Sequence, residues 1–416
     1  MPLFQQVGSV AYKPGLERVE SFSQMIGSPH LAMPTIHVAG TNGKGSTSHM
    51  LAAVLQSAGY RVGLFTSPHL RDFRERMRVD GRMIERDDVV AFVANHREAM
   101  ERCGLSFFEM TAAMAFDFFA RSRVDVAVVE TGLGGRLDAT NIVVPQLSII
   151  TNIALDHTQY LGDSVAQIAA EKGGIIKRGR PVVLGESSSE YTYVFEQRAQ
   201  QMQSRLTQAQ SRFAVERVEV FADFQRITMS AGAGVYDLDL LGEYQHKNLV
   251  TLLAAVEAIN SSEDISLEVG VEALHAGLRR VVALTNLAGR WQVLGRDPLM
   301  VCDTGHNPHG LREVARQIAR QRYDRLYCVV GFANDKRLEE ILPLLPTDAY
   351  YIFTQANISR AYDAHEVAAV ARGMGMECEV VVGVGEAVAA ARARATSQDM
   401  IYIGGSTFVV AEIEDM

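Results

Sequence analysis

Short runs of β-branched and other apolar residues alternate along the chain with longer segments whose apolar positions recur at helical spacing. This alternation is typical of βα units, in which parallel strands are covered by helices. One such helix is predicted over residues 46–57, before the stop signal of Gly59. Its apolar face would carry Met50, Leu51, Val54 and Leu55. Strands are predicted in this first part at 35–39, 61–66, 124–130, 147–153 and 181–184.

The pattern changes over residues 190–240. Short alternating strands around a glycine-containing turn at 231–234 predict an antiparallel appendage within 215–241. An amphipathic helix is expected over 249–259. A second βα series then begins near Trp291, with strands expected at 300–303, 326–330, 349–353, 379–382 and 400–403. A boundary near 283–288 would divide the chain into domains at 1–285 and 289–416, both of the α/β class.

Composition narrows the range of functions. The 416 residues carry a net charge of −9, which argues against a sequence-independent nucleic-acid binder, because such proteins need a cationic surface. The four cysteines lie far apart without a CxxC pair, which fits a reducing cytosol. No signal-like start and no apolar stretch of about 18 residues occurs, so export and membrane insertion are not expected. A cytoplasmic protein is predicted.

The most informative segment runs from Gly40 to Ser46 and reads Gly-Thr-Asn-Gly-Lys-Gly-Ser, with Thr41, Asn42, Gly43, Lys44 and Gly45 between its ends. It joins a buried strand to a helix, so its backbone amides and the positive helix end would face a phosphate chain while the lysine neutralises it. The generic phosphate-loop pattern fails here, because Val38 takes its first glycine position and Gly45 follows the lysine. A glycine-rich helix cap is therefore the alternative.

Three polar side chains follow neighbouring predicted strands. Ser67 closes the strand after the glycine loop's helix, Glu130 closes the strand at 124–130, and His157 follows the next one. Ligands of open α/β sheets bind outside the carboxyl ends of strands, so these groups could hold a Mg²⁺ that bridges nucleotide phosphates. Taken singly, they also fit a turn hydroxyl, a surface charge and a helix-start residue.

Together these segments resemble the folylpolyglutamate synthase and dihydrofolate synthase family, relatives of the muramyl amino-acid ligases. The resemblance spans nearly the whole chain in the family's order. Its matching segments are HVAGTNGKGST (37–47), LFTSPHL (64–70), SFFE (106–109), ETGLGGRLDATN (130–141), ITNIALDHTQYLG (150–162), AAEKGGIIK (169–177), AGRWQ (288–292), DTGHNPHG (303–310) and GGSTFVVAEI (404–413).

The resemblance implies a P-loop NTPase-like N-terminal domain with a parallel sheet and a small antiparallel appendage, followed by a smaller Rossmann-like C-terminal domain. It also implies an ATP-dependent ligase that adds L-glutamate to dihydropteroate and to tetrahydrofolates through an acyl phosphate. The expected cofactors are ATP, Mg²⁺ at two sites, a monovalent cation and a carbamylated Lys172. Its partners would be these small molecules, without nucleic acid or membrane, and the protein would be a monomer.

The resemblance also assigns roles near the phosphates. Residues 40–46 would bind ATP, with Lys44 bridging the γ-phosphate and the acyl phosphate. Ser67, Glu130 and His157 would hold Mg²⁺, and carbamylated Lys172 would support a second ion. Lys44, His157 and Lys172 are thus the expected catalytic residues. An exposed lysine at a helix end is the alternative reading of Lys172.

Further roles concern the two substrates. Phe108 would stack on the pterin and Asp138 would accept its hydrogen bonds, although Phe108 also fits the core at the start of a helix over 110–119 and Asp138 fits a turn cap. Asn248 would read adenine, and it is also a suitable N-cap for the helix at 249–259. The remaining nucleotide contacts, made in a cleft that closes between the domains, would come from Arg290, Asp303 and His306.

Some positions depart from the family. Gly305 stands where members commonly carry alanine, and Arg337 follows Asp335 and Lys336 where many carry a second acid. Little matches between 190 and 239. Two other functions stay open: another Mur-type amino-acid ligase, and a non-catalytic nucleotide switch with a phosphate loop.

Overall fold

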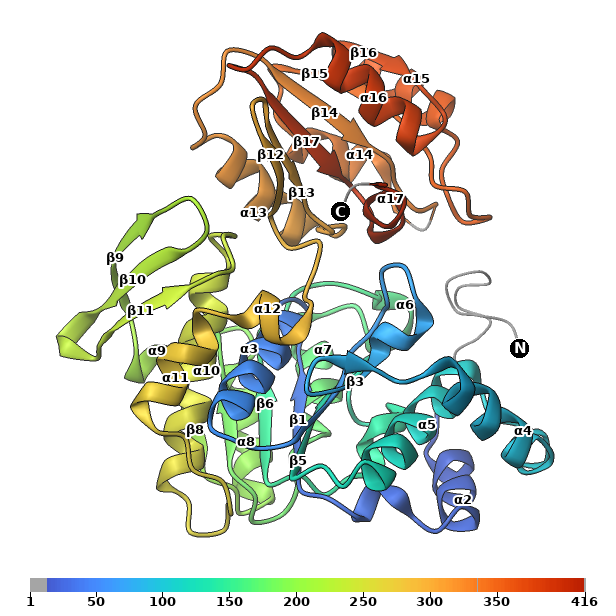
Figure 1. Ribbon diagram of the computed structural model, residues 1–416, viewed down its shortest axis with the longest axis vertical. Helices are drawn as coiled ribbons and strands as arrows, with labels where there is room; N and C mark the ends of the chain where they lie inside the picture. Colours follow the sequence, from blue (N-terminus) through green and yellow to red (C-terminus); the bar gives the residue numbers. More distant parts are fainter. Residues whose placement is uncertain (1–12, 335, 415–416) are drawn as a thin grey trace. The chain divides into compact units, whose positions relative to one another are not determined.

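The computed structural model describes residues 13–334 and 336–414 (Figure 1). They divide into two compact units. The first contains residues 13–239 and 245–287, and the second contains 240–244 and 288–414. The short segment 240–244 therefore groups with the second unit although both of its flanks belong to the first. Among these residues, no helix is long and apolar enough to cross a membrane.

The first unit is built on a mainly parallel sheet with the strand order β4-β3-β2-β5-β1-β6-β7-β8. The central strand β1 is buried at every position, as expected for a strand that helices cover on both faces. It pairs in parallel with β5 and β6, so the carboxyl ends of these three strands meet at one edge. The strands are β1 (Thr35–Ala39), β2 (Val62–Phe65), β3 (Met77–Val79), β4 (Arg82–Met83), β5 (Val126–Glu130), β6 (Leu147–Ile150), β7 (Val182–Leu184) and β8 (Leu206–Gln208).

Helices pack on this sheet in three groups. One group contacts α3 and consists of α10, α11 and α12, while α2, α4 and α5 share a core that includes Phe116 and Phe119. The third group, α6, α7 and α8, packs around a core with β6 and β7. Their bounds are α2 (Glu17–Met25), α3 (Lys44–Ser57), α4 (Arg86–Cys103), α5 (Phe107–Arg121), α6 (Thr158–Leu161), α7 (Val165–Gly173), α8 (Thr192–Gln201), α9 (Ala209–Arg212), α10 (Gln245–Ser261), α11 (Val271–Leu278) and α12 (Val281–Thr285). Short 3-10 turns lie at Pro29–Leu31, Phe73–Arg76, Ala139–Ile142 and Ser230–Gly232.

The predicted antiparallel appendage is present as a three-stranded sheet, β11-β10-β9, which forms the yellow-green hairpins of Figure 1. Its strands are β9 (Val215–Val220), β10 (Gln225–Met229) and β11 (Val235–Leu238). Central strand β10 alternates between buried and half-buried positions. This period of two is the one that the sequence pattern predicts for a sheet with one covered face.

The second unit holds a six-stranded sheet with the order β12-β13-β17-β14-β15-β16. Only the β12–β13 pair is antiparallel among its pairings. Its core contains Tyr351 and Tyr402. The elements are β12 (Gln292–Arg296), β13 (Leu299–Cys302), β14 (Leu326–Val330), β15 (Ala349–Phe353), β16 (Cys378–Val380), β17 (Met400–Gly404), α13 (Pro308–Ile318), α14 (Leu338–Ile341), a 3-10 turn at Leu342–Leu344, α15 (Ala364–Gly373), α16 (Val384–Arg394) and α17 (Thr407–Ala411).

The predicted α/β fold class is thus confirmed in both units. The helices begin earlier than their apolar periods indicate. Helix α3 starts at Lys44 rather than at residue 46, because the glycine loop itself turns into the helix. Helix α5 starts at Phe107, where Ser106 and Glu109 form a capping box. Helix α10 starts at Gln245, four residues before the predicted start.

Candidate active site

The glycine loop between β1 and α3 is shaped by two close approaches. Gly40 and Gly43 both have positive φ angles, of 149° and 81°. A Cβ on Gly40 would collide with the Thr151 side chain, and one on Gly43 would collide with Asn248. Only glycine satisfies both conditions. The amides of the first turn of α3 lack intrahelical acceptors, as in any α-helix, and this leaves a site suited to an anion.

Strand β6 and the residues after it hold this loop in place. The Thr41 amide donates to the Asn152 carbonyl at 2.9 Å, and the Asn42 amide donates to the Asn152 side-chain oxygen at 2.8 Å. The Thr151 hydroxyl donates to the Asn42 carbonyl at 2.6 Å. These bonds fix the loop's backbone before any ligand binds, so ligand binding does not have to include the entropic cost of ordering the loop.

Lys44 and Glu130 face each other at the start of α3. The Lys44 ammonium lies 4.0 Å from Glu130 Oε1, and it donates to the Thr41 carbonyl at 3.1 Å. The other Glu130 oxygen accepts a bond from the Ser67 amide at 3.1 Å. The lysine of the glycine loop and two residues that the sequence places at separate strand ends, Glu130 and Ser67, therefore converge. Glu130 is only 3% exposed, so the prediction of a buried carboxylate at a strand end, rather than a surface charge, is supported.

A buried arginine that the sequence patterns did not single out also lies in this part of the site. Arg76 donates to Nδ1 of His69 at 2.8 Å, and its guanidinium lies over the Phe107 ring. Burial lowers the pKa of Arg76 to about 10, while the charges of Glu130 and Glu75 act in the opposite direction. It adds a cation near Glu130. Its position in a 3-10 turn gave no periodic signal by which it could have been found.

His157 lies in the loop after β6 and precedes α6 as its N-cap, with a left-handed φ of 49°. The helix-start reading is therefore part of the observed structure. Its Nε2 lies 3.9 Å from the Asp156 carboxylate. Its predicted place beside Ser67 and Glu130 on a metal stays a prediction. Among residues 13–334 and 336–414, no three His, Cys, Asp or Glu side chains are already clustered around a metal-sized point.

Lys172 occupies the last turn of α7, but it is not the exposed helix-end lysine of the alternative reading. It is 4% exposed, and its ammonium donates to the Gly40 carbonyl at 2.8 Å. Burial, with a smaller contribution from the nearby Lys44 charge, lowers the pKa of Lys172 to about 7. Two lysines thus donate hydrogen bonds to successive carbonyls of the glycine loop, Lys172 to Gly40 and Lys44 to Thr41.

Asp138 caps the 3-10 turn at Ala139–Ile142, as the turn-cap reading expects. Its Oδ2 accepts the amides of Gly132 and Leu133 at 2.9 and 2.8 Å. Its Oδ1 accepts the Thr140 amide at 3.0 Å and the Thr140 hydroxyl at 2.5 Å. Burial raises the pKa of Asp138, and these four bonds oppose that shift. The carboxylate organises the segment that follows β5.

Phe108 lies in the first turn of α5 and is half-buried. Its ring packs 6.0 Å from that of Phe65, centroid to centroid, and it covers Gly132 so closely that a Cβ there would collide with it. It is packed against the core that surrounds α5. The core reading of Phe108 is therefore supported, while its partly exposed ring leaves a surface next to the segment that Asp138 organises.

Asn248 is the fourth residue of α10, so its reading as an N-cap is wrong. Its amide donates to Gln245 Oε1 at 2.8 Å, and Gln245 in turn donates to the Ser46 hydroxyl at 3.1 Å. Gln245 is fully buried. The sequence patterns missed it because its partner Ser46 lies 199 positions away.

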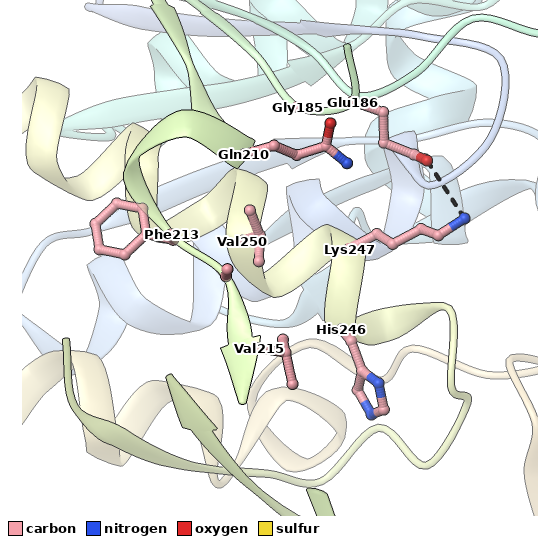
Figure 2. Close-up of a pocket in the computed structure, with 9 residues that line it drawn as sticks. Gly185, Glu186, Gln210, Phe213, Val215, His246, Lys247 and Val250 are labelled. Carbon is pink, nitrogen blue, oxygen red and sulfur yellow. Dashed lines mark ion pairs between the residues drawn. The ribbon is translucent and has the colours of Figure 1, made fainter. Parts of the chain in front are cut away.

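A separate cavity of about 330 Å³ lies against a different side of α10 (Figure 2). Lys247 and Glu186 point toward each other across it and form an ion pair at 3.3 Å. Glu186 also accepts a bond from Asn152 at 2.9 Å, which connects the cavity to the residue that holds the glycine loop. Its wall also includes Phe213, Val215, Val250, Gln210 and His246.

In the second unit, Asp303 follows β13 and is buried. It accepts bonds from the Tyr244 hydroxyl at 2.5 Å and from the amides of Trp291 and Gly305, both at 2.7 Å. Burial raises the pKa of Asp303, while the Tyr244 bond and the Arg290 charge lower it. Sequence patterns did not indicate Tyr244.

The other two residues predicted in the second unit, His306 and Arg290, make hydrogen bonds to nearby backbone carbonyls. Nδ1 of His306 lies 3.0 Å from the Thr304 carbonyl, and Arg290 donates to the Gly289 carbonyl at 3.3 Å. Arg337, the position that departs from the family pattern, precedes α14 and forms an ion pair with Glu340 at 2.7 Å, while Asp335 lies outside the described residues.

Comparison with known proteins matches both parts of the chain to ligase families. Residues 38–256 match the Mur ligase middle domain, and residues 289–407 match the Mur ligase glutamate ligase domain. The dihydrofolate synthase/folylpolyglutamate synthase of Bacillus subtilis is 33% identical over 375 residues, which is 86% of each chain. A probable bifunctional folylpolyglutamate synthase/dihydropteroate synthase of Haloferax volcanii is 37% identical, and this chain spans only 48% of its length.

Solved structures give the same relationship. A Mycobacterium tuberculosis folylpolyglutamate synthase complexed with ADP and AMPPCP superposes with a TM-score of 0.87 at 31% identity, covering 96% of this chain and 94% of that one. Escherichia coli FolC in complex with DHPP and ADP superposes with a TM-score of 0.84 at 30% identity, covering 98% and 94%. The chain therefore belongs to the folylpolyglutamate synthase/dihydrofolate synthase family of Mur ligases.

Proposed function

We propose that this chain is an ATP-dependent ligase that adds L-glutamate to dihydropteroate and to tetrahydrofolates. One observation carries the proposal: Lys44, Lys172 and Glu130 converge on a glycine loop whose helix end is suited to a phosphate. The names of the relatives support the choice of substrates. The E. coli structure holds DHPP and ADP, and another family structure holds Mn, AMPPNP and L-glutamate.

The chemistry follows from the poor electrophilicity of a carboxylate. A pteroate or folate carboxylate oxygen attacks the γ-phosphorus of ATP, and ADP leaves as the acyl phosphate forms. The glutamate nitrogen then attacks the acyl carbon, phosphate leaves and the amine gives up a proton. Lys44 and the amides of the first turn of α3 would neutralise and orient the transferred phosphoryl group. Residues 40–46 would thus form the nucleotide phosphate site.

Ser67 and Glu130 fit a magnesium ion in their donor chemistry, since Mg²⁺ prefers oxygen ligands and keeps several waters, and His157 would add a nitrogen donor. The buried Glu130 carboxylate would supply the ion's anionic ligand, in a site where the Lys44 ammonium lies 4.0 Å from it. The ion would supply charge neutralisation at the phosphates when bound. Within the chain, the Ser67 amide restrains the Glu130 carboxylate by donating to one of its oxygens at 3.1 Å.

We also propose that Lys172 is carbamylated. In its neutral form the amine attacks CO₂, forms an N–C bond and releases one proton, and the product is a carboxylate on the same stem. Its burial and its place beside Gly40 support this assignment, because the modification would replace a cation next to the phosphate site by an anion. That anion would support a second Mg²⁺, and the same region would accept a monovalent cation.

Assignments for the rest of the site are also proposals. Phe108 would stack on the pterin, and Asp138 would share its oxygens with the pterin's amino-pyrimidine edge. Asn248 would contact adenine. The second unit would supply Arg290, Asp303 and His306 to the nucleotide. We propose a cytoplasmic monomer that acts on small molecules and has no nucleic-acid or membrane partner. Residues 1–285 would form the ATP-binding domain, and residues 289–416 would form the glutamate ligase domain.

Product analysis tests the proposed function. The purified protein is incubated with ATP, Mg²⁺, L-glutamate and either dihydropteroate or a tetrahydrofolate, and the products are identified by mass spectrometry. The expected result is a product one glutamyl unit heavier and one ADP per amide bond formed. Nucleotide binding without any glutamate-dependent ADP release would instead favour the switch, and ligation of another amino acid to another acid would favour a different Mur-type ligase.

A further inference from the structure

Gln245 links the glycine loop to the first turn of α10. Its Nε2 donates to the Ser46 hydroxyl at 3.1 Å, and its Oε1 accepts from the Asn248 amide at 2.8 Å. The side chain is fully buried, and Ser46 and Asn248 are 2% and 7% exposed. A buried amide must satisfy both its donor and its acceptor within the protein, and here Ser46 and Asn248 satisfy one each.

The orientation of Gln245 determines what its two partners can offer a ligand. Ser46 accepts a bond from Gln245, so its own hydroxyl hydrogen is left to be donated elsewhere. Asn248 gives one amide hydrogen to Gln245, which fixes the rotation of its side chain beside Gly43. One buried amide therefore sets the directions of polar groups on two different helices, α3 and α10.

The chain position of Gln245 adds a second constraint. The residue before it, Tyr244, belongs to the second unit and donates to Asp303 at 2.5 Å. The rest of that short segment is tied to the same unit through Gln317, which bonds the Glu243 amide at 2.8 Å and the Leu241 carbonyl at 2.9 Å. Gln245 is thus the first residue of the first unit after a chain crossing. A fixed side chain there anchors the start of α10 to the loop.

We propose that Gln245 is a positioning residue for the nucleotide, one that orients Ser46 and Asn248 together. The proposal rests on the proposed ATP site, and it predicts that Gln245 acts on nucleotide binding and leaves the affinity for glutamate unchanged. Loss of its two bonds should weaken nucleotide affinity about tenfold, which is the equilibrium effect of roughly one to two buried hydrogen bonds.

A double-mutant cycle tests this coupling directly. The affinity for ATP without hydrolysis is measured by calorimetry with AMPPCP for the wild type, Gln245→Ala, Ser46→Ala and the double variant. If Gln245 acts through Ser46, the double variant should bind within about twofold of the weaker single variant. Fully additive losses would overturn the proposal. Gln245→Met, which keeps the length of the side chain, repeats the test should the alanine variant fail to fold.

Asn260→Ala is the matched control. Asn260 lies on the same helix and also makes two side-chain bonds, with the carbonyl and the amide of Val269, each at 2.8 Å. Its loss should leave AMPPCP affinity within about twofold of the wild type. Equal weakening in both variants would show a general effect of α10 stability and would contradict positioning. Because the readout is binding, a wild type that binds AMPPCP but ligates no glutamate would refute the proposed function alone.

Discussion

The ammonium group of Lys172 donates a 2.8 Å hydrogen bond to the backbone carbonyl of Gly40, a residue 132 positions earlier in the chain. The bond joins the last turn of α7 to the first residue of the glycine loop. A side chain that looks like an ordinary helix-end lysine in the sequence is therefore part of the loop's immediate surroundings. Its chemistry is the most direct test of the site.

Lys172→Ala should abolish glutamate ligation, because the carboxylate created by carbamylation would be absent. Added bicarbonate should not restore the variant, whereas a short carboxylic acid such as acetate should restore part of the activity by occupying the vacated space. In the wild type, intact mass spectrometry under CO₂ should detect one added carboxyl group that Lys172→Ala lacks. Full activity of the alanine variant would contradict the modification.

Lys44→Ala should lower ligation at least about a hundredfold, the usual cost of removing one preorganised charge from a developing anion. The fold should remain, since the Lys44 side chain is partly exposed and makes one hydrogen bond, to the Thr41 carbonyl, and a long ion pair of 4.0 Å with Glu130. The measurement is glutamate-dependent ADP release, with circular dichroism as the check on folding. Lys13→Ala removes an exposed lysine and serves as control. Retained ligation by Lys44→Ala would contradict the proposal that Lys44 binds the transferred phosphoryl group.

Gly43→Ala and Gly59→Ala form a matched pair. Both glycines have left-handed backbones, with φ of 81° and 92°, so alanine adds similar strain at each. A Cβ at 43 would also collide with Asn248, whereas nothing lies within 4 Å at 59. We expect the strained backbone to cost about 1 kcal/mol of stability in both variants, the collision to add a further loss at 43, and nucleotide binding to be lost only in Gly43→Ala. Calorimetry with AMPPCP distinguishes the two, and equal binding would contradict the role of the loop.

Asp138→Ala should lower the free energy of unfolding by about 2–4 kcal/mol, because it leaves several buried donors without an acceptor. Urea unfolding measures this loss. The ratio of activities with dihydropteroate and with a tetrahydrofolate tests the proposed pterin contact separately, because unfolded protein lowers both activities equally and cancels in the ratio. We expect activity with dihydropteroate to fall further than activity with the tetrahydrofolate. An unchanged ratio would mean that the carboxylate only caps its turn.

His37 should make the fold sensitive to acid. Burial, with a smaller contribution from the charge of Lys177, lowers the pKa of His37 to about 3 from its ordinary 6.5. Below pH 6.5 the unfolded chain therefore takes up a proton that the folded chain refuses, so stability falls as the pH falls. From pH 8 to pH 5 this amounts to about 2 kcal/mol. Urea titrations of His37→Gln should show a smaller fall over that interval, and parallel curves would refute the linkage.

The elements of the fold were predictable where periodicity was strong. The sequence pattern predicts strand β1 at its observed bounds, because a fully buried parallel strand is a continuous apolar run. The starts of α3 and α10 were not predictable, since Lys44 and Gln245 are polar residues that begin helices through contacts with the loop and not through an apolar period.

Recognition of the site depended on local motifs, which placed Lys44, Glu130 and Ser67 near one another. Local motifs do not indicate side-chain contacts between residues that lie far apart in the chain. Nothing near Tyr244 indicates that its hydroxyl meets Asp303, 59 positions away, and nothing near Arg76 indicates a buried cation. Asp138 shows the reverse case: its local sequence suggested a cap, and the structure shows how much of its carboxylate that cap occupies.

Residues 240–244 make the second unit discontinuous in sequence. A polypeptide that begins at residue 288 would lack Tyr244 and the backbone that Gln317 binds, and it would expose Asp303 and Gln317 to water. Separate expression of the C-terminal part should consequently give a poorly stable product. A fusion of residues 240–244 to residue 288 through a short glycine-rich linker should be more stable, because this polypeptide would contain both segments of the second unit.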